Sequence, residues 1–355
     1  MSAESNNQGR AFEYVMLTTL LNEIKKIRPA VIEKNSSFDA ALRAWNSISN
    51  GIQENLRRAA KAAVETIFDL EPLILEDGND KLTLFIQPDT QGETGDVRDI
   101  LIVRRDIHWE IGLSLKHNHF AVKHSRLAKK LDFGTSWYGV PCSPRYWNRI
   151  APIFEYLENK KRNGSKWRDL PNKEQDVYIP ILQAFIDEVL AANKQDEEVP
   201  RKMVEYLLGK YDFYKVISID SEEKTRLLTF NLRGTLNQAA HNIEPKHIIP
   251  ITNLPTRIVA MEFKPKSTTT VELYMNNGWQ FSFRIHNAAT LVETSLKFDI
   301  QIIGMPSTII AIMRIFQCVL CIRSGKINSR CSGTEKIPAK IYGVRPGINC
   351  TFKNF

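Results

Sequence analysis

Hydrophobic and polar residues alternate along residues 109–116, WEIGLSLK. This period of two predicts a strand with one buried face, and the short apolar run 100–103 before it predicts a second strand. The polar residues 104–106 separate the two runs, so together they predict a β-hairpin. Its apolar face carries Trp109, Ile111, Leu113 and Leu115.

The rest of the chain changes texture near residue 215. Before it, apolar residues recur mainly at helical spacing, and after it short β-like runs are separated by Gly, Pro and Asn. Residues 137–149, rich in aromatics and proline, suggest an ordered loop. The predicted helices cover 12–26, 38–70 (closed by Pro72), 121–131 and 175–208 with a break near 193–200. The predicted strands, besides the hairpin, are 81–86, 215–219, 226–232, 256–263, 269–275, 278–285 and 297–304.

This order of elements predicts an α/β (α+β) fold in three parts. We expect an α/β half over residues 1–215 and a β-rich region over 216–306, which either stands alone or packs as one unit with the first. Composition changes again at Thr308, so residues 307–355 are interpreted as an appended, poorly folded tail whose removal leaves the body folded.

Composition narrows the class of protein. The chain has 355 residues, enough for a sizeable core, and contains no apolar run long enough to cross a membrane. Its first residues lack the pattern of a secretory signal. Five cysteines, an odd number, argue against a disulfide framework. We therefore expect a protein of the bacterial cytoplasm.

The net charge of +8 comes almost entirely from the end of the chain. From Thr308 onward there are eight Lys or Arg against one Glu, and the rest of the chain holds 40 basic and 39 acidic residues. Bulk basicity is therefore no argument for nucleic acid. A local patch still counts, because residues 116–130 hold five Lys or Arg and three His without a carboxylate.

The hairpin brings chemistry together at one end. If its turn is centred between residues 106 and 107, Asp99 faces Ser114, about 5 Å away between Cβ atoms, and Lys116 follows on the same face. A carboxylate that holds Mg²⁺ and a cation beside a phosphate are the groups that phosphodiester hydrolysis needs. The plainer alternative is that Asp99 begins a strand and Lys116 solvates its end.

Several long segments support the first interpretation. The segment GDVRDILI…WEIGLSLKHNHFAVKHSRL looks like the active-site region of PD-(D/E)XK nucleases. With GRAFEYV, WYGVPCSPRYW, LLGKYDFYKVI and NGWQFSFRIHNA…SLKFDIQIIG it closely resembles the HaeIII family of type II restriction endonucleases, from about Gln8 to Pro306. The resemblance implies a mixed sheet flanked by helices and Mg²⁺-dependent cleavage of double-stranded DNA, with GGCC as the target. It also implies a cognate cytosine DNA methyltransferase as functional partner, and leaves monomer or homodimer open.

Carried onto this chain, the motif places its aspartate at Asp99 and its lysine at Lys116. Ser114 stands where the motif has an acid two residues before the lysine, which leaves the second metal ligand unassigned. Glu13 is the preferred candidate, because at helical spacing it shares a stripe with apolar residues, where a lone carboxylate is costly. Asp96 and Glu110 are the alternatives. The apolar stripe comprises Met16, Leu17, Leu20 and Ile24.

The basic segment after the hairpin is interpreted as DNA-contacting, with a solvated basic face as the alternative. If this segment is a helix, Lys123 and Arg126 lie on one face, since they are three residues apart, and they would contact adjacent phosphates. Its histidines have poor spacing for zinc. The residues proposed to contact DNA are His117, Asn118, His119, Lys123, His124 and Arg126.

Two further alternatives remain open. The absence of an acid at Ser114 also fits a catalytically decayed DNA-binding protein on a nuclease scaffold, and a repair nuclease of the same fold would cut without a fixed sequence. In the tail, zinc binding is weighed against simple disorder, since only half of the cysteine spacing suits zinc. The cysteines concerned are Cys318, Cys321, Cys331 and Cys350.

Overall fold

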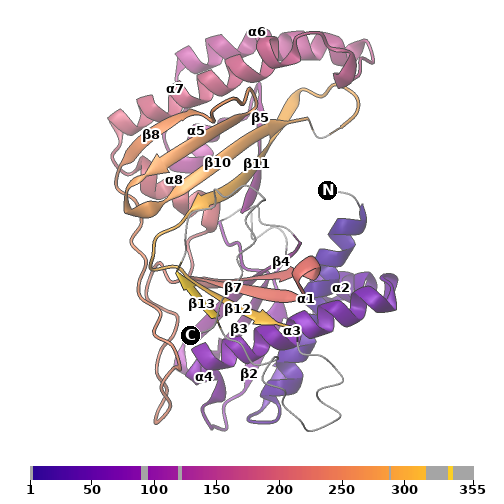
Figure 1. The fold of residues 1–355 in the computed structure, drawn as a ribbon, viewed down its shortest axis with the longest axis vertical. Helices are drawn as coiled ribbons and strands as arrows, with labels where there is room; N and C mark the ends of the chain where they lie inside the picture. The colour runs from indigo at the N-terminus through magenta and orange to yellow at the C-terminus, as the bar shows by residue number, and fades with distance from the viewer. Residues whose placement is uncertain (1–2, 89–94, 119–121, 288, 317–334, 339–355) are drawn as a thin grey trace, which may run out of the picture.

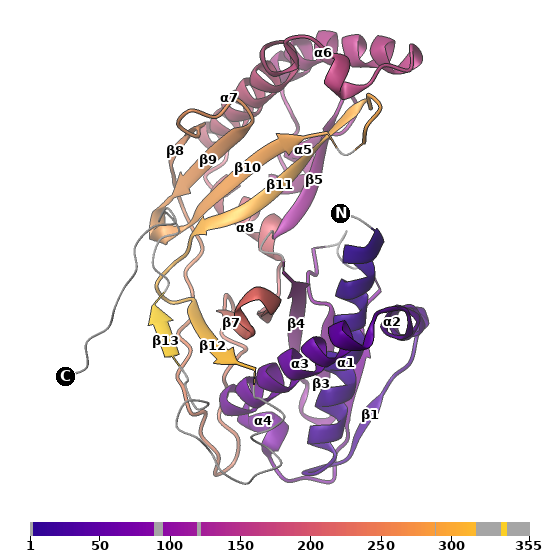
Figure 2. The ribbon, with the colours of Figure 1, turned by 45° about the vertical axis from the view of Figure 1, so that its right-hand side comes forward.

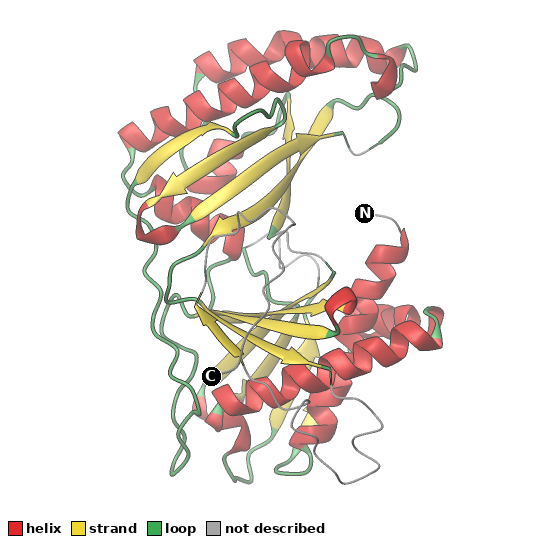
Figure 3. Ribbon diagram, in the orientation of Figure 1, coloured by secondary structure: helices red, strands yellow, loops and turns green. Residues whose placement is uncertain are grey.

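The computed structural model describes residues 3–88, 95–118, 122–287, 289–316 and 335–338. Their strands form two sheets, an eight-stranded main sheet and a five-stranded second sheet. The α-helices are α1 (Ala3–Ile24), α2 (Ser36–Ser47), α3 (Asn50–Leu70), α4 (Pro72–Leu75), α5 (Phe133–Tyr138), α6 (Pro144–Arg162), α7 (Ile179–Gln195) and α8 (Val199–Leu208). Figures 1 and 3 show α6 and α7 at one end of the molecule and α1–α4 at the other, with the two sheets between them.

The main sheet is mixed. Its strands are β1 (Ala30–Ile32), β2 (Leu82–Ile86), β3 (Ile100–Arg104), β4 (Trp109–His117), β6 (Phe213–Ile219), β7 (Lys224–Phe230), β12 (Ile310–Ile315) and β13 (Glu335–Pro338). They lie in the order β1-β2-β3-β4-β6-β7-β12-β13, with β1–β2 and β4–β6 parallel and the other pairs antiparallel. Helix α1 packs against β2 and β4, and α3 against β7 and β12, which covers one face of the sheet.

The second sheet is antiparallel, in the order β5-β11-β10-β9-β8. Its strands are β5 (Lys123–Ala128), β8 (Ile258–Phe263), β9 (Thr270–Met275), β10 (Gln280–His286) and β11 (Ser295–Gly304). Alternate residues such as Phe281, Phe283 and Phe298 are fully buried in one cluster with residues of α5–α8. Strands with this period of two bury one face and leave the other polar.

The two sheets share part of a core. Phe213, Ile217 and Phe230, on the face of the main sheet away from α1, belong to the same hydrophobic cluster as the second sheet. Tyr214 and Val216, on the other face of β6, belong to the cluster around α1–α3. The predicted boundary at residue 215 therefore falls inside β6, a strand that contributes to both cores.

The α/β (α+β) class and most predicted elements are confirmed. The hairpin pairs Ile100 with Leu113, so its positions sum to 213 as the centred turn requires. The predicted helix 38–70 is interrupted by Ile48 and Ser49, which separate α2 from α3. The predicted break in 175–208 lies between α7 and α8. No helix in the described part of the chain is long and apolar enough to cross a membrane.

The predicted helix 121–131 is wrong. Lys123–Ala128 form strand β5, which pairs with β11 along its whole length. Buried Ser125 and Leu127 alternate with exposed Arg126, a period of two that tertiary pairing selects over the local helical spacing.

The predicted loop 137–149 is also largely helical. Asp132 caps α5 by accepting a hydrogen bond from the Thr135 amide, and Ser143 caps α6 in the same way, followed by Pro144 at the first helical position. Ser-Pro at a helix start is a known signal. The aromatic and proline content obscured this signal, and only residues 139–143 are loop.

The predicted tail begins inside the main sheet. β12 pairs with β7 from Ala311 to Ile315, and Ile309, Ile312 and Phe316 are buried. Residues 310–315 therefore belong to the main sheet, and the expectation that everything after Pro306 is dispensable for folding stays a prediction, against which the burial of Ile309, Ile312 and Phe316 argues. The four tail cysteines lie outside the described residues.

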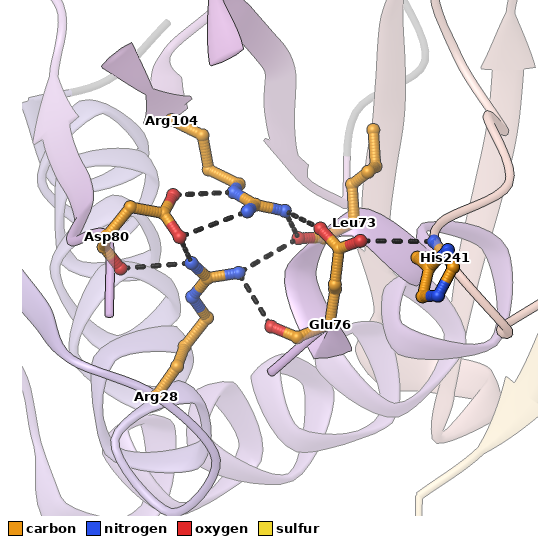
Figure 4. A network of polar contacts seen from close by, with 6 residues as sticks. All are labelled: Arg28, Leu73, Glu76, Asp80, Arg104 and His241. Carbon is orange, nitrogen blue, oxygen red and sulfur yellow. Dashed lines mark hydrogen bonds and ion pairs between the residues drawn. The ribbon is translucent and has the colours of Figure 1, made fainter. Parts of the chain in front are cut away.

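A network of ion pairs and hydrogen bonds surrounds Arg104 (Figure 4). It lies at the opposite end of β3 from Asp99. Arg104, the last residue of β3, donates to Asp80 at 2.8 Å and to Glu76 at 2.5 Å. Arg28, just after α1, pairs with the same Asp80 and donates to the Glu76 carbonyl at 2.8 Å. The Glu76 carboxylate also accepts the His241 amide at 3.0 Å. The network ties four distant segments together.

Candidate active site

Asp99 lies at the start of β3, at the open end of the hairpin. Its amide donates to the Leu113 carbonyl at 2.7 Å, and its Oδ2 accepts the Leu115 amide at 2.5 Å. Lys116 Nζ lies 3.5 Å from the same Oδ2. The two side chains are 27% and 30% exposed, so the carboxylate and the ammonium meet where solvent and a substrate can reach them. The predicted convergence of Asp99 and Lys116 is confirmed.

Ser114 follows Leu113, the residue of β4 that pairs with Ile100, and is 4% exposed. The parallel pairing of β4 with β6 places Lys215 next to Ser114. Lys215 is also 4% exposed. Burial, together with the nearby Lys116, lowers the pKa of Lys215 to about 7, although the charge of Asp99 raises it.

Sequence reasoning missed Lys215. A signal was present, because a central strand buried on both faces is expected to be apolar throughout, and FYKVISI carries a lysine in its middle. Only the register of two strands nearly 100 residues apart in sequence brings this lysine to the hairpin.

The two alternative metal ligands are both engaged by Arg98. The Asp96 carboxylate accepts hydrogen bonds from the Arg98 side chain at 2.8 and 2.7 Å, and Glu110 accepts another at 2.7 Å. Burial raises the pKa of Asp96, but hydrogen bonds from Arg98 and Gln87 outweigh it and hold that pKa below its usual value. Both carboxylates are therefore engaged by the guanidinium of Arg98.

Glu13 lies on α1 and is half-buried. The four residues of the predicted apolar stripe on the same helix are all fully buried. Helix α1 packs against the face of the main sheet that carries Leu113 and Leu115. Ser114 and Lys116 alternate with these leucines along β4 and therefore point to the opposite face of the sheet. Its role as second ligand stays a prediction. Within the described residues, no three Asp, Glu, His or Cys side chains gather in a cluster able to hold a metal ion.

Two residues at the end of β4, His117 and Asn118, contact the carboxylate of Asp220, which follows β6 directly. His117 Nε2 lies 2.8 Å from Asp220 Oδ2, and the Asn118 side chain contacts the Asp220 carboxylate and accepts the Asp220 amide. Asn118 has φ = 53°, a left-handed conformation that asparagine tolerates. These contacts order the exit from β4 toward the second sheet. His119 lies outside the described residues.

The cations of β5 point to opposite faces of the second sheet. Lys123 donates to the Tyr206 carbonyl at 2.8 Å, its ammonium lies 3.6 Å from the Tyr206 ring centroid, and burial lowers its pKa to about 8. Arg126 is 46% exposed and contacts Ser295 at 2.8 Å. The prediction that both grip adjacent phosphates from one helix face is wrong, because residues three apart on a strand alternate. His124 lies on β5, and its side chain is outside the described part.

An aspartate and a lysine that meet at the open end of a hairpin are the kinds of group that phosphodiester hydrolysis requires. The model of the HaeIII restriction endonuclease family matches residues 9–306. The Type II restriction enzyme HaeIII of Haemophilus aegyptius is 52% identical over 313 residues, which cover 88% of this chain and 98% of that enzyme. No solved structure matches the chain. The chain belongs to the HaeIII restriction endonuclease family, and it is an enzyme of the site-specific deoxyribonuclease class.

Proposed function

We propose that this enzyme hydrolyses phosphodiester bonds of double-stranded DNA in a Mg²⁺-dependent reaction at a short specific site, GGCC. The observation that carries the proposal is the Asp99–Lys116 pair, solvent-accessible and 3.5 Å apart, at the end of the hairpin. The family membership supports the DNA substrate and the sequence specificity.

The residues present suit a magnesium ion. Mg²⁺ usually keeps several waters and is bound by one or two carboxylates together with substrate phosphates, so a site with few acids is sufficient. Asp99 would hold the ion through its carboxylate, and Glu13 is proposed as the second carboxylate. When bound, the ion would polarise the scissile phosphate and activate water. Lys116 places its ammonium beside the phosphate and stabilises the charge that develops there.

Ser114 distinguishes this proposal from a catalytically decayed DNA-binding protein. A serine cannot supply the second negative charge, so the proposal requires a carboxylate from outside β4, for which Glu13 is the candidate. A decayed protein would shift DNA on a gel without cutting it, and a repair nuclease would cut without a fixed pattern.

The test is incubation of plasmid DNA with the full chain, with and without Mg²⁺. We expect discrete fragments only with the metal, and no fragments after chelation. Asp99→Asn should abolish cleavage while binding to the target site persists, because the substitution removes the metal ligand and leaves the DNA-contacting groups. Continued cutting by Asp99→Asn would show that the hairpin is not the active site.

Partners and location follow from the same proposal. The enzyme would act beside a cognate cytosine DNA methyltransferase in the bacterial cytoplasm, as a monomer or a homodimer. Its DNA contacts are proposed to come from the end of β4 and from β5. The proposed contact residues are His117, Asn118, His119, Lys123, His124 and Arg126.

A further inference from the structure

The segment immediately before Asp99 is held against β4 by one arginine. Arg98 is 6% exposed, and its guanidinium donates to both oxygens of Asp96 and, at 2.7 Å, to Glu110 on β4. The same guanidinium lies 4.2 Å from the centroid of the Tyr211 ring, just before β6. Arg98 therefore joins its own turn, β4 and the residues before β6.

Gly112 makes room for this arginine. A Cβ built on Gly112 would lie 2.0 Å from Arg98 Cδ and 2.5 Å from Cγ. Glycine weakens the interior of a strand, and one often marks a close approach of another part of the chain. In the middle of β4, the stem of Arg98 occupies the space that the side chain of residue 112 would fill.

The backbone of the same segment is fixed on both sides. The Gln87 side chain donates to the Arg98 carbonyl at 3.0 Å, and the Gln87 amide donates to the Asp99 carbonyl at 2.9 Å. At the start of the segment, the Lys210 amide donates to the Gly95 carbonyl at 3.1 Å. The close contact at Gly95 requires the preceding Gly209, whose φ is 92° and whose added Cβ would lie 3.0 Å from the Gly95 oxygen.

We propose that Arg98 is a positioning residue for DNA cleavage: by clamping residues 95–98 onto β4 across Gly112, it fixes the orientation of the Asp99 carboxylate. In this role Arg98 acts through Asp99. The inference rests on the proposed role of Asp99. Partners that orient a metal ligand are worth about 10- to 100-fold in metal affinity, and misplacing a reacting group by about 1 Å costs about 100-fold in rate.

A purely structural arginine offers a matched control on the same strand. Arg104, at the opposite end of β3, is 4% exposed and also binds two carboxylates, those of Asp80 and Glu76 (Figure 4). Its removal should also destabilise the fold, because it takes the cation from Glu76 and one of the two cations from Asp80. Only Arg98 adjoins Asp99.

The experiment compares Arg98→Met with Arg104→Met in the full chain. Binding of Mn²⁺ to the enzyme–DNA complex is followed by electron paramagnetic resonance, alongside the single-turnover cleavage rate, DNA affinity without metal, and the thermal midpoint. For Arg98→Met we expect Mn²⁺ affinity to fall at least about 10-fold and the rate about 100-fold, with DNA affinity within about threefold. For Arg104→Met we expect a lower midpoint, with Mn²⁺ affinity and rate unchanged below it.

Gly112→Ala provides a second variant, which displaces the Arg98 stem without removing a charge. It should reproduce the loss of Mn²⁺ affinity, and it carries the test if Arg98→Met does not fold. Equal effects of the Arg98, Gly112 and Arg104 substitutions on Mn²⁺ affinity and rate would overturn the positioning role. Asp99→Asn is measured in parallel. If this variant binds Mn²⁺ and cuts DNA normally, the proposed role of Asp99 in catalysis is wrong. If it loses both, an absence of effect in the Arg98 variant contradicts only the positioning role of Arg98.

Discussion

At the scale of single residues, the proposed active site departs at one position from the nuclease motif that the chain resembles. Ser114 occupies the place of an acid, and Asp96 and Glu110 are engaged by Arg98. A second carboxylate for a metal therefore has to come from outside the hairpin. Glu13 is the proposed source, on a helix that packs against β4.

Substitution of Glu13 tests this assignment. Glu13→Gln should reduce the cleavage rate nearly as much as Asp99→Asn, by several orders of magnitude, because each removes a metal ligand. Ser114→Ala should be mild by comparison. Cleavage rates in Mg²⁺ at saturating DNA give the comparison. Near-normal cutting by Glu13→Gln, with loss in Asp96→Asn or Glu110→Gln, would assign the second ligand to the hairpin after all.

A buried acid away from the site makes stability depend on pH. Glu71 is fully buried, accepts hydrogen bonds from the Tyr214 hydroxyl and, at 2.8 Å, from the Asn237 amide, and burial raises its pKa to about 7 against those hydrogen bonds. Because the pKa of Glu71 is higher in the folded state than in the unfolded state, protonation of Glu71 stabilises the fold at low pH. This contribution is lost as the pH rises from the unfolded-state pKa to the folded-state pKa. The free energy of unfolding should therefore fall by about 3 kcal/mol between pH 4.5 and pH 7 from this group alone.

Glu71→Gln cannot ionise, so this fall should disappear. Denaturant unfolding from pH 4.5 to 8 should show a variant that gains stability relative to the wild type as pH rises. Glu188→Gln is the control, because Glu188 is also buried but caps α6 through Ser143. Parallel curves for Glu71→Gln and the wild type would contradict the assignment.

At the scale of elements, the change of residues 123–128 from predicted helix to strand alters what their cations do. Arg126 lies on the exposed face of β5, and Lys123 is held by Tyr206. Arg126→Ala should lower the slope of log binding constant against log salt concentration by about one, whereas Lys123→Ala should change it by less. Titrations of DNA binding at several salt concentrations, without metal, measure both slopes. The reverse order would mean that Lys123 leaves Tyr206 to bind phosphate.

Strand β12 is the element whose importance the sequence concealed. Fully burying one large aliphatic side chain contributes about 1.5–3 kcal/mol, and Ile309 and Ile312 are both buried where β12 meets β7. Truncation after Pro306 should therefore leave little soluble folded protein. Truncation after Phe316 should keep a cooperative thermal transition. A cooperative transition in the shorter chain would restore the view that the body ends at residue 306.

At the scale of the whole molecule, the two sheets contribute to one hydrophobic cluster, which the main sheet enters through Phe213, Ile217 and Phe230. Lys116 lies near the end of β4, and the next strand along the chain, β5, belongs to the second sheet (Figures 1 and 2). Figure 2 shows the N-terminal end of α1 pointing toward β5 and β11. The hairpin with the Asp99–Lys116 pair therefore lies between the helices around the main sheet and the second sheet with its proposed DNA contacts.

The sequence by itself determined what depends on local periodicity. Strong alternation fixed the hairpin and its register, and therefore the convergence of Asp99, Ser114 and Lys116, because a period of two leaves one way to bury Ile111 and Leu113. Helical spacing gave α1 with its buried stripe. Long characteristic segments identified the family.

Only the tertiary structure decided what depends on partners distant in sequence. Residues 123–128 carry weak local preference, so pairing with β11 determined their conformation. β12 belongs to the main sheet because it pairs with β7. Lys215 lies beside Ser114 because of the register between β4 and β6. The role of Gly112 became visible only with the side chain of Arg98 lying across it. These contacts join residues that are far apart in sequence, so a local pattern of hydrophobic and polar residues cannot predict them.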